Sequence, residues 1–304
     1  MEGAAPSAPY VLDSCTLSLA GHQFSFEPAG AESVRLPPAF DSFRAPIDAA
    51  PVTARYRVHP ANAAQWTSPA EVDQIWQTDT WRMGRTPDGD YVLAIHVLPD
   101  ERPLAVARFA PDFSHGDLLC RAGRHGAPTP FAFNYPCDQV AVLNALNPHG
   151  IGIVHAGAVA IDGNGLLFCG RSGAGKTTLS RLCRDAGATL LNDDRQFVWA
   201  GGTGVCLAPT PWHGLEPEIN NKTVPLRAIF HLVQAPATRC TLLSPIDSAA
   251  KLLGNTVAPF YRADAMARTL AWTETITARV PSYLLEFTPT ADAVNACRGI
   301  LESS

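Results

Sequence analysis

A glycine-rich run, Gly-Arg-Ser-Gly-Ala-Gly-Lys-Thr-Thr, occupies residues 170–178. It matches the pattern G-x-x-x-x-G-K-[ST], in which glycines let backbone N–H groups surround phosphate oxygens. The lysine of this pattern places a positive charge beside the β and γ phosphates, and the hydroxyl that follows coordinates Mg²⁺. We therefore predict a site for a nucleoside triphosphate and Mg²⁺ formed by Gly170, Ser172, Gly173, Ala174, Gly175, Lys176, Thr177 and Thr178.

The residues on either side supply the elements that this pattern requires. An apolar stretch at 166–169 predicts a short buried strand, and residues 179–184 begin a helix. The N-terminus of such a helix attracts anions, because its unpaired N–H groups point towards the ligand. A plain glycine–serine linker would lack these flanks, so we favour phosphate binding.

Two adjacent carboxylates, Asp193 and Asp194, follow Thr177 by 16 and 17 residues. That interval fits one helix and one strand, and it places the pair at the carboxyl end of the strand, beside the glycine run. One carboxylate there could hold Mg²⁺ while the other accepts a proton from an attacking hydroxyl. A solvated turn is the alternative, and the apolar strand at 188–192 favours the functional interpretation.

Four more residues are candidates on weaker grounds. His155 lies in an apolar strand predicted over 151–161, where spacing alone favours an ordinary core histidine. A polar, turn-rich segment at 209–218 could border the site, and its Glu216 is a candidate Mg²⁺ ligand. His213 could contact substrate and Lys222 could contact phosphate. For both residues, an ordinary surface loop is an equally good interpretation.

Composition narrows the class of protein. Of 304 residues, 46% are hydrophobic and 17% are charged, which is typical of a globular chain. A net charge of −5 gives no general attraction to nucleic acid or to anionic membranes, and no apolar run reaches membrane-spanning length. The N-terminus lacks a basic region followed by an apolar core, so we expect a cytoplasmic protein. The eight cysteines are scattered without C-x-x-C pairs, so we expect free thiols and no zinc site.

Two domains are expected. Short apolar or alternating runs between turn residues predict a β-rich N-terminal domain over residues 1–130. Residues 131–304 are expected to form an α/β nucleotide-binding domain, starting with a helix at 138–146. Strands at 151–161 and 166–169 are joined by a hairpin turn at 162–165. Further strands are predicted at 197–200, 205–208, 226–233 and 283–287, and helices near 248–257, 264–279 and 291–301.

The segment 154–194 resembles the HPr kinase/phosphorylase group. It is most similar to HPr-kinase-related proteins of uncharacterised operons and of peptide-modification clusters. The shared features are a histidine on the strand before the glycine run, the run itself, and an Asp-Asp pair after one helix and one strand. The specific match covers about residues 150–235. The resemblance implies an α/β P-loop core related to ATP-dependent phosphoenolpyruvate carboxykinase, whereas the N-terminal part does not look like the usual HPr kinase N-domain.

The resemblance also implies roles for the candidate residues. Lys176 would bind the phosphates of ATP, and Thr177 would bind Mg²⁺. Asp193 would be the general base for a serine hydroxyl, with His155 and Asp194 supporting the base or the metal.

The implied activity is transfer of the γ-phosphoryl group of ATP to a serine of a peptide or protein. Some relatives phosphorylate the terminal serine of a lasso-type precursor peptide. The N-terminal domain could recognise the acceptor, although nothing in its residues identifies a ligand, and the family resemblance suggests homo-oligomers. True HPr kinases carry a glutamate–arginine–glycine segment where this chain has only Trp-His-Gly-Leu-Glu at 212–216, so neither phosphorylase activity nor HPr as the target follows.

Other nucleotide-binding classes fit less well. An ABC ATPase would need an L-S-G-G-Q helix and a later strand ending in Asp-Glu, and a GTPase would need an N-K-x-D signature; the sequence has neither. Shikimate-type kinases usually begin with the phosphate loop, whereas 169 residues precede it here. A kinase for a small metabolite and a nucleotide-binding regulatory protein without transfer activity remain as alternatives.

Overall fold

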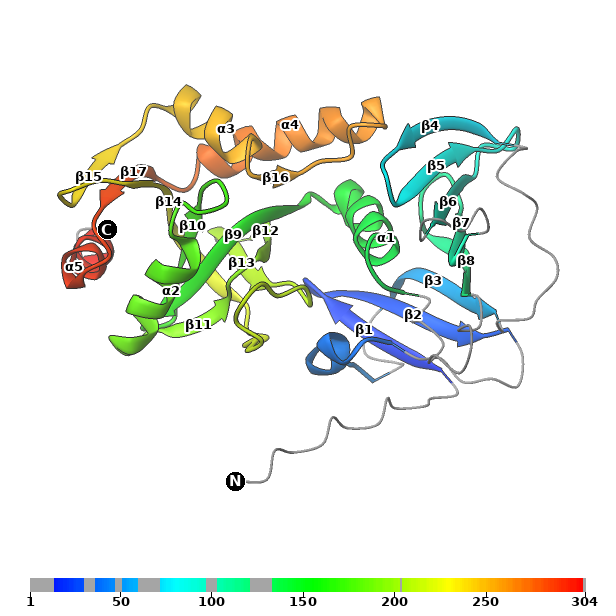
Figure 1. Ribbon diagram of the computed structural model, residues 1–304, viewed down its shortest axis with the longest axis horizontal. Coiled ribbons are helices and arrows are strands. Elements are labelled where there is room, and N and C mark those ends of the chain that lie inside the picture. Colours follow the sequence, from blue (N-terminus) through cyan, green and yellow to red (C-terminus); the bar gives the residue numbers. More distant parts are fainter. Residues whose placement is uncertain are drawn as a thin grey trace. The chain divides into compact units, whose positions relative to one another are not determined.

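The computed structural model describes residues 14–29, 36–46, 51–59, 72–96, 103–120, 133–202 and 204–302. The chain divides into two compact units, residues 1–145 and residues 146–304, each built on a large mixed sheet with few helices (Figure 1). The expected α/β class is confirmed at this level. No helix in the described ranges combines the length and the apolar character needed to cross a bilayer.

The first unit contains, within the described residues, one eight-stranded sheet in the order β1-β2-β3-β8-β7-β6-β5-β4. Its buried centre is aromatic: the ring of Tyr56 lies 5.7 Å from those of Phe26 and Phe109, centroid to centroid, and its hydroxyl donates to Phe113 O at 3.1 Å. The elements are β1 (Cys15–Leu19), β2 (His22–Pro28), the 3₁₀ helix η1 (Pro38–Phe43), β3 (Val52–His59), β4 (Asp73–Gln77), β5 (Trp81–Arg85), β6 (Tyr91–Ile95), β7 (Ala105–Phe109) and β8 (His115–Cys120).

Helix α1 (Cys137–Leu146) leads from the first unit into the second. The second unit holds a nine-stranded sheet in the described part of the chain. Its strands are β9 (Ile151–Ile161), β10 (Asn164–Cys169), β11 (Thr189–Asn192), β12 (Arg195–Gly201), β13 (Gly204–Pro209), β14 (Val224–Gln234), β15 (Arg239–Leu242), β16 (Thr256–Val257) and β17 (Ser282–Phe287). Its helices are η3 (Asn147–His149), α2 (Lys176–Asp185), α3 (Pro245–Leu253), α4 (Ala263–Thr277) and α5 (Ala291–Glu302).

Two long strands close part of this sheet into a ring. The first half of β9 pairs with β12 and its second half pairs with β10. Strand β14 begins beside β13 and then runs parallel to β10, so the path β10-β9-β12-β13-β14 returns to β10. Beyond the ring, β14 also pairs in parallel with β17.

Helices cover both faces of the sheet, which explains why β9 is apolar along its whole length. Alternate side chains of a strand point to opposite faces. Accordingly, Val154 and Ala156 pack in one cluster with residues of α3 and α4, whereas Val159 and Ile161 pack in a second cluster with residues of α2 and α5.

The strand directions bring the candidate residues to one edge of the sheet. Strands β10, β14 and β17 are parallel, and β11 has the direction of β10 because both run antiparallel to β9. The segments that follow these strands therefore leave the sheet at the same edge. They are the glycine run after β10, the Asp-Asp pair after β11, and residues 235 and 288 after β14 and β17.

Most predicted elements of the second unit are present, including the hairpin turn between β9 and β10. The helix predicted near 248–257 is displaced: α3 begins at Pro245 behind the capping residue Ser244, whose hydroxyl accepts from Asp247 N at 3.2 Å. It ends before Gly254, and Thr256–Val257 instead pair with β9 as strand β16. All cysteines whose side chains are described are free thiols, as expected.

A substitution at Gly152 of β9 would test the packing between the sheet and α4. A Cβ atom there would lie 2.3 Å from Trp272 Cζ2, and Trp272 is itself fixed by a 2.9 Å hydrogen bond from Nε1 to Val198 O. We expect Gly152→Ala to lower the free energy of unfolding by about 1–3 kcal/mol, as overpacking does. Gly299→Ala, in α5 with no atom near the new methyl group, should instead raise it by up to about 1 kcal/mol. Urea unfolding of both variants measures the difference, and equal effects would contradict the packing described.

Candidate functional site

The glycine run forms the connection between β10 and α2. Gly173 and Gly175 adopt positive φ angles of 80° and 100°, which L-residues with side chains rarely adopt. Gly175 also packs on Phe287, because a Cβ there would lie 2.7 Å from the Cζ atom of that ring. Among the described residues, no side chain caps α2, whose N-cap is Gly175. The N–H groups of the first helical turn are therefore directed to the loop, where an anion would be stabilised.

Lys176 lies at the start of α2 with only 9% of its surface exposed. Its Nζ donates to the carbonyl oxygens of Gly170 at 2.8 Å and Arg171 at 3.3 Å, both in the same loop. Burial lowers the pKa of Lys176 from its usual 10.5, and the nearby charges of Asp194 and Asp193 offset part of this effect. The ammonium group is thus held against the loop by hydrogen bonds to two carbonyl oxygens, which phosphate oxygens could replace.

Asp193 follows β11 and is buried, with 3% exposure. Its Oδ1 accepts from Gly214 N at 2.8 Å, and its Oδ2 accepts from Leu215 N at 3.0 Å and Glu216 N at 3.1 Å. The Thr177 hydroxyl donates to the same Oδ2 at 3.4 Å. Asp193 therefore holds the segment 214–216 and lies beside the hydroxyl that was predicted to bind Mg²⁺.

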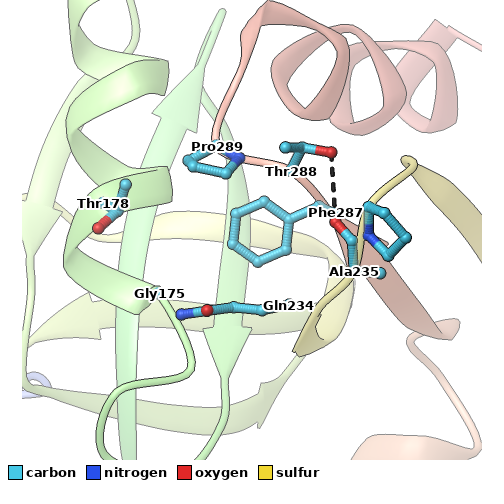
Figure 2. A pocket seen from close by; sticks show the side chains of 8 residues that line it. Gly175, Thr178, Gln234, Ala235, Phe287, Thr288 and Pro289 are labelled. Atoms are coloured by element: carbon cyan, nitrogen blue, oxygen red, sulfur yellow. Dashed lines mark hydrogen bonds between the residues drawn. The ribbon is translucent and has the colours of Figure 1, made fainter.

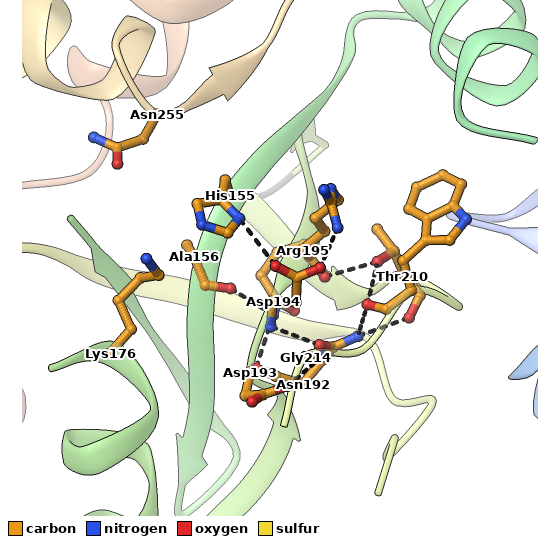
Figure 3. A network of polar contacts seen from close by, with 12 residues as sticks. His155, Ala156, Lys176, Asn192, Asp193, Asp194, Arg195, Thr210, Gly214 and Asn255 are labelled. Atoms are coloured by element: carbon orange, nitrogen blue, oxygen red, sulfur yellow. Dashed lines mark hydrogen bonds and ion pairs between the residues drawn. The ribbon is translucent and has the colours of Figure 1, made fainter. Parts of the chain in front are cut away.

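Asp194 forms the second polar pair of the site. Its Oδ1 lies 3.0 Å from His155 Nδ1, and its Oδ2 forms an ion pair with Arg195 (Figure 3). Burial would raise the pKa of Asp194, but the hydrogen bond to His155 and the charge of Arg195 outweigh it and hold the pKa below its usual 3.8. His155 is 40% exposed at its side chain, and no described residue hydrogen-bonds its Nε2. The pair thus presents an oriented imidazole.

Buried amides hold the two aspartates in place. Asn192 donates from Nδ2 to the carbonyls of Thr210 at 2.8 Å and Trp212 at 2.9 Å, while its Oδ1 accepts from Asp194 N at 2.8 Å. Gln196 donates to Ala156 O at 3.0 Å, and so ties the Asp-Asp segment to β9. No sequence pattern pointed to these amides, although Asn192 directly precedes the aspartates.

Asn255 is a further residue that the sequence analysis missed. Its Oδ1 accepts from Gly170 N at 3.1 Å, and its backbone carbonyl accepts from His155 N at 2.7 Å. Asn255 therefore joins the first residue of the glycine loop to the strand that carries His155. It lies 85 residues from Gly170 in sequence, so no local pattern could have revealed it.

Glu216 lies next to Asp193 through its backbone N–H, but its carboxylate is paired with two arginines. Its Oε1 lies 2.6 Å from Arg181 Nε and its Oε2 lies 2.8 Å from Arg184 Nη1, both on α2. Both carboxylate oxygens are therefore neutralised by guanidinium groups. Among the described residues, no group of three or more His, Cys, Asp and Glu side chains is placed to hold a metal ion. Of the other predicted metal ligands, Thr177 contacts Asp193, and Asp194 pairs with His155 and Arg195.

Comparisons with known proteins add little to this geometry. No family model matches the sequence, and no curated protein matches it. Among solved structures, the Hpr(Ser) kinase/phosphatase from Coxiella burnetii is similar over 50% of this chain and 88% of its own length. The sequence identity is 15% and the TM-score is 0.30, a level of similarity that does not establish the family.

The lowered pKa of Lys176 makes a pH dependence testable. Anion binding needs the charged ammonium, so affinity for Mg-ATP should be full below the lowered pKa and should fall as pH rises through it, before the usual 10.5 is reached. Calorimetric titrations at increasing pH measure this loss. A Lys176→Met variant should have weak affinity with no such alkaline fall, and a matching fall in the variant would assign the effect to another group.

Proposed function

We propose that this chain is an ATP- and Mg²⁺-dependent kinase that transfers the γ-phosphoryl group to a hydroxyl, with a serine of a peptide or protein as the acceptor. One observation carries this proposal. The buried Lys176 ammonium donates to Gly170 O of its own glycine loop, and Asn255 joins Gly170 to the strand that carries the oriented His155–Asp194 pair. A phosphate cradle next to a proton acceptor is what phosphoryl transfer to an alcohol requires.

The residues present fit a triphosphate with its metal. The glycine loop offers backbone N–H groups, Lys176 offers a positive charge, and the Thr177 hydroxyl is a ligand of the kind that Mg²⁺ accepts. When bound, Mg²⁺ neutralises charge on the β and γ phosphoryl oxygens. Asp193 accepts from the Thr177 hydroxyl and so orients that hydroxyl for the metal. We assign no metal-binding role to the Glu216 carboxylate, because both its oxygens are paired with arginines.

The His155–Asp194 pair receives the proton of the acceptor. His155 Nε2 takes it from the hydroxyl while Asp194 holds Nδ1–H and so fixes the ring and its charge. The acceptor oxygen forms a bond to the γ-phosphorus as the bond from that phosphorus to the β–γ bridging oxygen breaks, and ADP leaves. Lys176 stabilises the charge that develops on the phosphoryl oxygens.

We propose roles for the two aspartates that differ from those the family resemblance implies. The resemblance implied Asp193 as the base, yet its oxygens accept three backbone N–H bonds and one hydroxyl bond. A base must offer a free lone pair within reach of the acceptor. We therefore assign the proton transfer to His155 with Asp194, and the placement of Thr177 and of residues 214–216 to Asp193.

The acceptor class rests on the sequence resemblance and needs a direct test. The chain is incubated with Mg-ATP labelled at the γ-phosphate, together with serine-containing peptides, including precursor-like peptides with a C-terminal serine, and with small hydroxyl compounds. Mass spectrometry then reads the gain of one phosphate. Label on a serine peptide supports the proposal, and label only on a small molecule replaces the acceptor. Nucleotide binding without any transfer favours a regulatory protein.

A further inference from the structure

A cavity lies beside the glycine loop, at the ends of β14 and β17 (Figure 2). We infer that this cavity holds the nucleoside base of the donor nucleotide; the inference rests on the proposed function. Its volume is about 460 Å³, within the range of small-ligand sites. The described residues that line it are Gly175, Thr178, Gln234, Ala235, Pro236, Phe287, Thr288 and Pro289.

The cavity and the proposed phosphate cradle share the segment that begins α2. Gly175 and Thr178 line it, and Lys176 and Thr177 lie between them in the chain. The remaining lining residues follow or end β14 and β17, which run parallel to β10. A nucleotide whose phosphates lie at the start of α2 can therefore place its other end over the carboxyl ends of these two strands, where α/β sheets bind ligands.

The lining suits an uncharged aromatic ring. None of these eight described residues is ionisable, and Ala235, Pro236, Phe287 and Pro289 offer apolar surface. An aromatic base buried there gains apolar contact without separating a charge from water. A cavity of about 650 Å³ on the first half of the loop differs in this respect, because Arg171 and Lys251 line it and favour an anion. The uncharged lining therefore favours the cavity next to Thr178 as the site of the base.

Hydrogen bonds join the residues that line this cavity to the glycine loop and to one another. Gln234 Nε2 donates to Gly173 O at 2.8 Å, which fixes the end of β14 to the glycine run. Ala235 N donates to Phe287 O at 3.0 Å, and Thr288 Oγ1 donates to Ala235 O at 3.2 Å, so the two strand ends hold each other. The cavity is thus shaped before a ligand arrives, which lowers the entropy lost on binding.

Ala235→Phe is the variant that tests the inference. Its larger side chain fills the cavity without removing the backbone hydrogen bonds of residue 235. Ala237→Phe is the matched control, because Ala237 is exposed and outside the lining. Affinities for Mg-ATP and for magnesium tripolyphosphate are measured by calorimetry on both variants and on the unmodified chain. Tripolyphosphate has the phosphates but no base, so it reports on the cradle alone.

We expect Ala235→Phe to weaken Mg-ATP binding by at least about tenfold and to leave tripolyphosphate binding within about twofold. Ala237→Phe should change neither affinity. Unchanged Mg-ATP binding by Ala235→Phe, or equal affinities of the unmodified chain for Mg-ATP and tripolyphosphate, would overturn the base site while leaving the phosphate cradle in place. Failure of the unmodified chain to bind either ligand would instead overturn the proposed function itself.

Discussion

Replacing Lys176 with methionine should reduce kcat/KM for phosphoryl transfer by about 10²–10³-fold, because a positioned charge on the transferring group contributes about 2–4 kcal/mol. Methionine keeps most of the length and bulk of the side chain and removes only the ammonium group. Among the described residues, that ammonium is the one cationic group that donates hydrogen bonds to carbonyls of the glycine loop. Affinity for Mg-ATP should fall as well, by at least about tenfold.

Lys222→Met is the matched control for this variant. Lys222 is exposed, and its backbone N–H donates to Asn220 O at 2.7 Å, a bond that the substitution keeps. Initial rates and Mg-ATP titrations are compared for both variants, with circular dichroism melting curves to confirm that each folds. Equal activity of Lys176→Met and the unmodified chain would remove Lys176 from the mechanism. Equal losses in both variants would mean that the effect is not specific to the loop.

The second large effect is expected at the His155–Asp194 pair. Either His155→Asn or Asp194→Asn should lower kcat by about 10²–10⁴-fold, the usual contribution of general base catalysis. Mg-ATP affinity should stay within about threefold, since neither residue is assigned to the phosphates. The double variant should be little worse than either single variant, because two groups that act as a unit are not additive.

Two other aspartates complete this test. Asp185→Asn, at the exposed end of α2, is the control for loss of one negative charge and should leave kcat unchanged. Asp193→Asn should weaken the hold on residues 214–216 and so change Mg-ATP affinity or thermal stability together with rate. If Asp193→Asn abolished transfer with intact affinity while Asp194→Asn turned over normally, the base would be Asp193 and our assignment would be wrong.

The local pattern around the loop was predictable because neighbouring residues form it. An apolar strand, a glycine run and a helix follow one another within residues 164–185, and the hairpin turn before them has its own glycine signal. The proximity of Thr177 and Asp193 was also predictable from their spacing in the sequence, because one helix and one strand return the chain to the same edge of a sheet. The structure indeed records Thr177 and Asp193 in contact.

The rest depends on contacts between distant segments, which spacing does not encode. Glu216 stands in a turn-rich segment beside the site, yet its carboxylate pairs with arginines 32 and 35 residues earlier on α2. Asn255 reaches Gly170 across 85 residues. The cavity beside Thr178 uses ends of β14 and β17 that become neighbours only when these strands pair. For the same reason, the strand ring of the second unit and the strand order of the first were not predictable.

The central claim is that the glycine loop with Lys176 binds the phosphates of a nucleotide. Calorimetric titration of the purified, unmodified chain with Mg-ATP near neutral pH tests it most directly. We predict saturable binding of one nucleotide per chain that competes with magnesium tripolyphosphate. No detectable heat or saturation at millimolar nucleotide, in a sample shown to be folded, would contradict the claim and the function built on it.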